Sequence, residues 1–247
     1  MFRLIQGLLR FAVVVLLLAV VALVVDVGSE SVSTEASAAS VGLSVSGVAV
    51  APRVVSAVAG DGKDLINIGN YWQRFLPDSY FTSPNAPNIC SVNPGGFEWF
   101  DLMSQDKNKI SFELENSINK LTEFINAKLK ALSLDHSKLF LIGFSQGTMM
   151  SLHYSLTNNN IIAGVVGYSG KIYDPTLLEK NIKSKPPIFL MHGDDDNIVP
   201  LEEMLEAKNF LLKNKVNLKT KIFKGCGHTI PTQGLSLGLE FININKK

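Results

Sequence analysis

The strongest candidate for chemistry in this sequence is a serine that stands between two glycines. The five residues read Gly143-Phe144-Ser145-Gln146-Gly147. An apolar run at 139–142 predicts a strand buried on both faces, and residues 148–156 follow with the spacing of a helix. A strand that turns sharply into a helix exposes the serine hydroxyl above the helix N-terminus, where free N–H groups favour negative charge. The pattern therefore predicts a nucleophile whose reaction generates an oxyanion.

A serine nucleophile needs a base, and the base needs a group that orients it. Downstream, the apolar run 188–191 predicts a second buried strand, which leads into a loop at 192–197 that contains three consecutive aspartates. Residues 219–223 predict a further strand, and His228 stands in the loop after it. Catalytic groups of open α/β sheets gather at the carboxyl ends of the strands. Ser145, one of the aspartates and His228 are thus expected to form a triad.

Other kinds of site find less support. Three consecutive carboxylates could bind a metal, but they do not match the alternating ligands of a calcium loop. No glycine-rich phosphate loop with its lysine occurs. We therefore expect no metal and no cofactor. The net charge is +1 without a basic run, so nucleic acid is not an expected partner.

The elements around these residues alternate between strands and helices. The apolar spacing predicts helices at 64–76, 111–132 and 201–212, and a further strand at 161–168. Such alternation favours a mostly parallel sheet with helices on both faces. A stretch at 83–94 that is rich in proline and asparagine predicts a long loop.

Several of these stretches are similar to the carboxylesterase, phospholipase and acyl-protein thioesterase group of α/β-hydrolases. The matching stretches are GDGKDLI (60–66), SPNAP (83–87), GFEWFDL (96–102), GFSQG (143–147), HGDDDNIVP (192–200) and GCGH (225–228). The resemblance covers about residues 54–241. It implies an α/β-hydrolase fold with Ser145 as nucleophile and His228 as general base. It also implies Asp196 as the orienting acid, because the family's aspartate stands four residues before a proline, here Pro200.

The implied activity is hydrolysis of carboxylic ester or thioester bonds through an acyl-enzyme on Ser145. The implied substrates are a small acyl ester, a lysophospholipid or an acyl thioester, and a homodimer is left open. The family normally carries a His-Gly pair before its oxyanion loop, and Ser56-Ala57 stand there in this sequence. The oxyanion donors implied are the backbone N–H groups of Val58 and Gln146. Because alanine lacks the freedom of glycine, the alternative is a degenerate α/β-hydrolase-like protein with little or no activity.

The first 60 residues differ from the rest in composition. They hold 16 valines and 10 alanines, whereas all 19 lysines and all 19 asparagines come later. The segment 11–25 is apolar and uncharged, and as a helix it would span about 22 Å, or slightly more if extended back to residue 8. We therefore divide the chain into an N-terminal hydrophobic segment with its linker at 1–40 and an α/β-hydrolase domain at 41–247.

Four interpretations of this N-terminal segment stay open. It is a secretory signal peptide, a membrane anchor through residues 8–25, a head foreign to the functional body, or a buried hydrophobic helix. A foreign head would follow from a mis-set start or a disrupted reading frame. The protein is exported or membrane-anchored under the first two interpretations, and cytoplasmic if the head does not belong to it.

Overall fold

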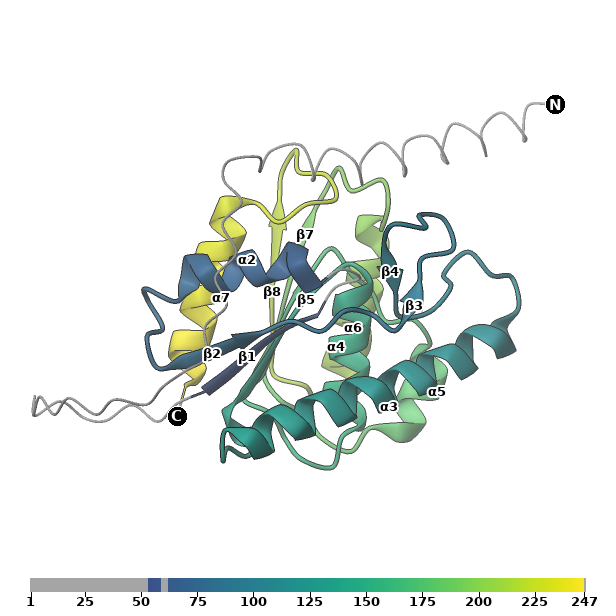
Figure 1. Ribbon diagram of the computed structural model, residues 1–247. Helices are drawn as coiled ribbons and strands as arrows, with labels where there is room; N and C mark the ends of the chain where they lie inside the picture. Colours follow the sequence, from purple (N-terminus) through teal and green to yellow (C-terminus); the bar gives the residue numbers. More distant parts are fainter. Residues whose placement is uncertain (1–52, 59–61, 247) are drawn as a thin grey trace, which may run out of the picture. The chain divides into compact units, whose positions relative to one another are not determined.

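The computed structural model describes residues 53–58 and 62–246 (Figure 1). The N-terminal segment predicted at 1–40, including its apolar run, lies outside the described residues. So do the residues 59–61, which belong to the expected oxyanion loop. Among the helices that the structure describes, none combines the length and the apolarity needed to cross a membrane.

A six-stranded parallel sheet forms the centre of the domain. Its strands are β1 (Arg53–Val58), β2 (Ser79–Thr82), β5 (Leu139–Phe144), β6 (Gly164–Tyr168), β7 (Ile188–Gly193) and β8 (Leu218–Phe223). They lie in the order β2-β1-β5-β6-β7-β8, and every neighbouring pair is parallel. The carboxyl ends of β5, β7 and β8, which carry the expected triad, therefore meet at one edge of the sheet.

Helices cover both faces of this sheet. They are α2 (Gly62–Trp72), α3 (Lys107–Ala131), α4 (Gln146–Thr157), α5 (Pro175–Asn181), α6 (Leu201–Lys213) and α7 (Thr232–Asn245). The helices α2 and α7 pack on one face and the other four on the opposite face (Figure 1). The prediction of an α/β-hydrolase fold with a parallel sheet flanked by helices is confirmed.

The alternation of side chains along β5 explains why this strand is apolar throughout. Leu139 and Leu141 belong to the core under α3 and α4, whereas Phe140 and Ile142 belong to the core under α7. All four side chains are buried. Successive residues of a strand point to opposite faces, so a strand covered on both sides needs an unbroken apolar run.

Some predicted boundaries shift. The strand predicted at 161–168 begins only at Gly164, and the helix predicted at 64–76 ends at Trp72. The helix predicted at 111–132 begins earlier, at Lys107, because the carboxylate of Asp106 accepts from the N–H groups of two residues in its first turn and caps it. None of these shifts changes the position of a candidate site residue.

The region expected to be a long loop contains a small hairpin. Its two strands, β3 (Asn88–Ile89) and β4 (Phe97–Glu98), pair in antiparallel register. The chain that leaves β4 contacts the residue after the nucleophile, since the backbone N–H of Trp99 donates to the side chain of Gln146. The hairpin thus brings residues 97–100 to the site.

Candidate active site

Ser145 occupies the sharp turn between β5 and α4. Its backbone has φ 53° and ψ −119°, a left-handed conformation that non-glycine residues rarely adopt. Hydrogen bonds hold the turn: the N–H of Ser145 donates to the carbonyl of Tyr168 at 2.9 Å, and the carbonyl of Ser145 accepts from the N–H of Thr148 at 3.0 Å. Strain of this kind persists where the surroundings enforce it and is common at functional sites.

Gly143 is required by the same turn. A Cβ at this position would lie 2.5 Å from both Cα and N of Thr148, in the first turn of α4. Backbone atoms cannot yield as a flexible side chain can, so any larger residue would push the helix away from the strand. The first glycine of the motif therefore permits the close approach of β5 and α4 that exposes Ser145.

The structure brings two of the three expected triad residues into contact. The Nδ1 atom of His228 lies 3.0 Å and 2.9 Å from the two carboxylate oxygens of Asp196. Asp196 is buried, with its side chain fully enclosed, whereas the side chain of His228 keeps 12% of its surface exposed. A buried carboxylate behind a partly exposed imidazole is the arrangement that fixes a tautomer with Nε2 free to accept a proton.

The charge of Asp196 is stabilised despite its burial. Burial by itself raises the pKa of this carboxyl. The hydrogen bond and charge of His228, together with the N–H groups of Val199 and Ile198, outweigh burial and hold the pKa below its ordinary value. Both N–H groups donate to the same oxygen, Oδ1, at 2.9 and 3.0 Å. The carboxylate is thus an ionised acceptor at neutral pH.

Two neighbouring residues position this pair and were not assigned such contacts from the sequence. His192 is buried in β7, and its Nε2 lies 2.8 Å from the carbonyl of Val199 and 3.4 Å from Oδ2 of Asp196. The carboxylate of Asp194 accepts from the N–H of Gly225 at 2.6 Å, which ties the loop after β7 to the loop that carries His228. The sequence showed an aspartate run, but spacing alone could not tell which carboxylate faces the histidine.

His228 lies beside the nucleophile turn. Its ring packs against Phe144, the residue before Ser145, with ring centroids 4.8 Å apart and an angle of 45°. In the part of the chain that the structure describes, the Ser145 hydroxyl is hydrogen-bonded neither to the backbone of α4 nor to His228. Catalytic hydrogen bonds often tighten only when substrate binds, so the observed arrangement is compatible with a triad.

The two expected oxyanion donors belong to Gln146, which follows Ser145, and to Val58 of the neighbouring strand β1. Gln146 begins α4, where the first N–H groups of a helix have no partner within the helix. Val58 is the last residue of β1 and pairs in register with Gly143, two residues before the serine. The loop that follows Val58 lies outside the described residues.

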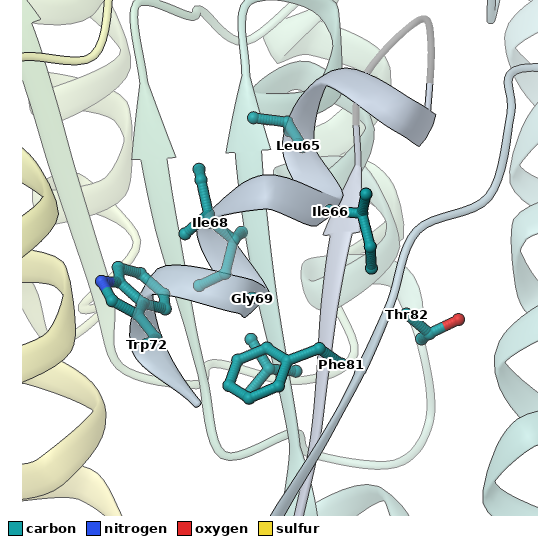
Figure 2. A pocket seen from close by; sticks show the side chains of 9 residues that line it. Leu65, Ile66, Ile68, Gly69, Trp72, Phe81 and Thr82 are labelled. Carbon is teal, nitrogen blue, oxygen red and sulfur yellow. The ribbon is translucent and has the colours of Figure 1, made fainter. Parts of the chain in front are cut away.

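Two hollows of the molecule lie away from the triad. One is a cavity of about 10 Å³ between α2 and the strands β1 and β2, enclosed by apolar side chains such as Leu65, Trp72 and Phe81 (Figure 2). Its volume admits one water molecule at most. The other is a groove of about 830 Å³ between α3, α4 and α5. Neither is lined by Ser145, Asp196 or His228, so the case for a site rests on the chemistry at the strand ends.

The three consecutive aspartates do not come together as a group of ligands. Over residues 53–58 and 62–246, no group of three or more histidine, cysteine or carboxylate side chains is placed to hold a metal ion. The aspartate run spreads its side chains instead: Asp194 and Asp196 make separate hydrogen bonds, and Asp195 is exposed.

The fold and the strand-end residues together define a protein of the α/β-hydrolase class. Residues 59–246 match the model of the phospholipase/carboxylesterase family, and the chain belongs to this family. The first residue of the match follows directly after Val58, so the match does not include the Ser56-Ala57 pair.

Individual relatives agree with this assignment. The chain is 30% identical over 182 residues to acyl-protein thioesterase 1 of Saccharomyces cerevisiae, covering 67% of this chain and 80% of the yeast protein. It is 22% identical over 175 residues to the esterase YpfH of Escherichia coli, covering 71% of this chain and 74% of that protein. The crystal structure of esterase PE8 superposes with a TM-score of 0.74 at 34% identity, over 79% of this chain and 93% of that structure. The chain is thus homologous to carboxylesterases and acyl-protein thioesterases.

Proposed function

We propose that this protein is a serine hydrolase that cleaves carboxylic ester or thioester bonds. The observation that carries the proposal is the strained turn at Ser145, with φ 53°, beside an imidazole that is hydrogen-bonded to a buried carboxylate. A non-glycine residue held in this conformation at a strand-to-helix turn costs free energy, and exposing a nucleophile explains why the cost is tolerated.

The reaction follows from the roles that these residues can take. Oγ of Ser145 attacks the acyl carbonyl while Nε2 of His228 takes its proton. Asp196 keeps the other ring nitrogen protonated and stabilises the imidazolium. The imidazolium then protonates the departing alcohol or thiol, which leaves an acyl group on Ser145. A water molecule, deprotonated by the same imidazole, releases the acid and restores the serine.

The negative charge that forms on the carbonyl oxygen needs hydrogen-bond donors. We assign this role to the backbone N–H groups of Gln146 and Val58. The N–H of Gln146 has the support of its place at the start of α4, where the helix dipole also favours negative charge. Loss of one such donor typically lowers the rate by about 10² to 10³. The substrates that we propose are small acyl esters, lysophospholipids or acyl thioesters.

One observation favours a second candidate function. Where the family normally has His-Gly, this chain has Ser56-Ala57, immediately before the oxyanion donor that we assign to Val58. A chain with an intact triad and a misplaced donor would be a degenerate α/β-hydrolase with little or no turnover. The experiment must therefore measure the nucleophile and the turnover separately.

The full-length protein is incubated with a fluorophosphonate probe and, separately, with p-nitrophenyl butyrate and a butyryl thioester. We expect labelling and hydrolysis in the wild type and neither in Ser145→Ala. Ser236→Ala is the matched control, because Ser236 is exposed on α7. Labelling without turnover would favour the degenerate protein. Undiminished labelling of Ser145→Ala would refute the assignment of the nucleophile.

A further inference from the structure

The side chain of Gln146 makes contacts that the proposed mechanism does not use. Its Oε1 accepts from the backbone N–H of Trp99 at 2.7 Å, and its Nε2 donates to the carbonyl of Phe100 at 2.6 Å. The partners lie 47 and 46 positions earlier in the chain. The carboxamide thus pairs with a donor and an acceptor at once, as a peptide unit does in a sheet.

The backbone of the segment that it holds must find its hydrogen-bond partners inside the protein. The side chains of Trp99 and Phe100 are buried, with residue exposures of 1% and 0%. Buried backbone N–H and carbonyl groups need partners, and an unpaired one costs about 1–3 kcal/mol. The carbonyl of Trp99 accepts from Asn88 and from Ser117 of α3. Gln146 supplies the partners of the N–H of Trp99 and the carbonyl of Phe100, the groups before and after that carbonyl.

The segment 97–100 also contacts a second loop near the nucleophile turn. The ring of Phe100 packs edge-on against Tyr173, with centroids 5.3 Å apart, in the loop that follows β6. The same loop region begins with Ser169, whose neighbour Tyr168 accepts from the N–H of Ser145. Gln146 therefore stands between the nucleophile turn on one side and the chain around Trp99 on the other.

We propose that Gln146 is a positioning residue: its carboxamide, bonded to the segment 97–100, holds the backbone N–H of Gln146 in place as oxyanion donor. The proposal rests on the function proposed above, in which the backbone N–H of the same residue binds the oxyanion. With its side chain anchored on Trp99 and Phe100, Gln146 has both its backbone and its side chain fixed. A displacement of the segment would therefore move the donor away from the position that the developing charge requires.

Two variants separate this role from general packing. Gln146→Met keeps the length of the side chain and removes both hydrogen bonds. Gln146→Glu keeps the acceptor, but its ionised form cannot donate to the carbonyl of Phe100 and adds a charge near the oxyanion. A protonated glutamic acid regains the donor and reproduces both bonds. Gln73→Glu is the matched control, because Gln73 is exposed.

Turnover of a short ester, p-nitrophenyl acetate, is measured as a ratio to the wild type between about pH 5 and pH 8. We expect Gln146→Met to lower kcat about 10- to 100-fold with little change in KM, because an interaction made only in the transition state is weakened. We expect Gln146→Glu to be impaired at the high end of this range and to recover as the pH falls. If only the charge mattered, the neutral Gln146→Met would be fully active.

A second measurement does not depend on activity. Hydrogen exchange at the backbone amide of Trp99 should be slow in the wild type and in Gln73→Glu, and faster in Gln146→Met. A wild type without ester turnover would contradict the proposed function. The exchange data would still test whether the side chain of Gln146 holds the backbone of Trp99. An active wild type with wild-type kcat in Gln146→Met, or a ratio for Gln146→Glu that does not change with pH, would overturn the coupling alone.

Discussion

The three consecutive aspartates provide a sharp test of the proposed triad, because their side chains differ only in what they contact. Oδ1 of Asp196 accepts from two backbone N–H groups and lies 3.0 Å from Nδ1 of His228. Oδ2 lies 2.9 Å from the same Nδ1 and 3.4 Å from Nε2 of His192. In Asp196→Asn the amide oxygen must stay at the Oδ1 position to keep those two N–H groups paired. The NH₂ group then occupies the place of Oδ2 and points at Nδ1 of His228.

This substitution favours the wrong tautomer of His228. An NH₂ group can only donate, and the amide oxygen at the Oδ1 position already accepts from two backbone N–H groups. The hydrogen bond from Nδ1–H of His228 is therefore weakened, and a tautomer with the proton on Nε2, whose bare Nδ1 accepts from the NH₂ group, is favoured. An imidazole that is protonated at Nε2 cannot accept the proton of Ser145. A triad in this state typically loses about 10⁴ in kcat, which corresponds to about 5.4 kcal/mol at 1.36 kcal/mol for each factor of ten.

The neighbouring positions serve as controls of the same chemistry. Asp194→Asn can still accept from the N–H of Gly225 and loses only the charge of a hydrogen bond of 2.6 Å. Charged hydrogen bonds are about twice as strong as neutral ones, so we expect kcat to fall by about fivefold at most. Asp195 is exposed and contributes its backbone N–H to the carbonyl of Cys226. We therefore expect Asp195→Asn to leave kcat unchanged.

The assay is hydrolysis of p-nitrophenyl butyrate by the three purified variants, with urea unfolding as a check that each is folded. We expect the loss of kcat to be by far the largest in Asp196→Asn, small in Asp194→Asn and smallest in Asp195→Asn. A folded Asp196→Asn variant that keeps a tenth or more of the wild-type kcat would refute the tautomer argument. An equally large loss in Asp194→Asn would show that the wrong aspartate was assigned.

Two further predictions concern the loops that hold the pair. Gly225 has φ +64°, and a Cβ added there would meet no atom within 4 Å among the described residues. Gly225→Ala should therefore add only backbone strain and lower the free energy of unfolding in urea by about 1–2 kcal/mol. An unchanged free energy of unfolding would mean that the loop relaxes and relieves the strain. The folded-state pKa of Asp196 is lowered, so its contribution to stability is present above about pH 4 and is lost as the pH falls through the folded pKa. Unfolding measured between about pH 3 and pH 6 should therefore show a steeper loss in the wild type than in Asp196→Asn, and parallel curves would contradict the assignment.

The strands that carry the candidate site could be predicted because each is a short apolar run that ends in a polar loop. Residues 188–191 illustrate both the success and its limit, since His192 and Gly193 continue β7 instead of starting the loop. A Cβ at Gly193 would clash with the carbonyl of Cys226. The glycine therefore marks a close approach of two chain segments, and this cannot be read from the strand alone.

Other elements could not be predicted from the sequence pattern, and the reasons are physical. The strands β3 and β4 have two residues each, too few to show a period. The helix α7 contains Gly234 and Gly238, which are poor helix formers. A Cβ at Gly238 would collide with the hydroxyl of Tyr168, so tertiary packing selects glycine there against its helical propensity. The contacts of the Gln146 side chain were also inaccessible, because they join residues about 46 positions apart.

The end of β1 carries the expected oxyanion donor Val58, so a defect there would lower activity even with an intact triad. Ser56 is fully buried there, and its hydroxyl has no hydrogen-bond partner among the described residues. The register of β1 nevertheless sets Val58 level with Gly143, beside the nucleophile turn. A backbone donor needs no particular side chain, so the exchange of His-Gly for Ser56-Ala57 can impair catalysis only by changing the path of the chain after Val58. Phosphonylation of Ser145 draws on the oxyanion donors in one step, whereas a full turnover needs them at both acyl-transfer steps. A large gap between labelling rate and kcat would therefore locate the defect in the backbone after Val58, and comparable efficiency in both would show that the donor is correctly placed.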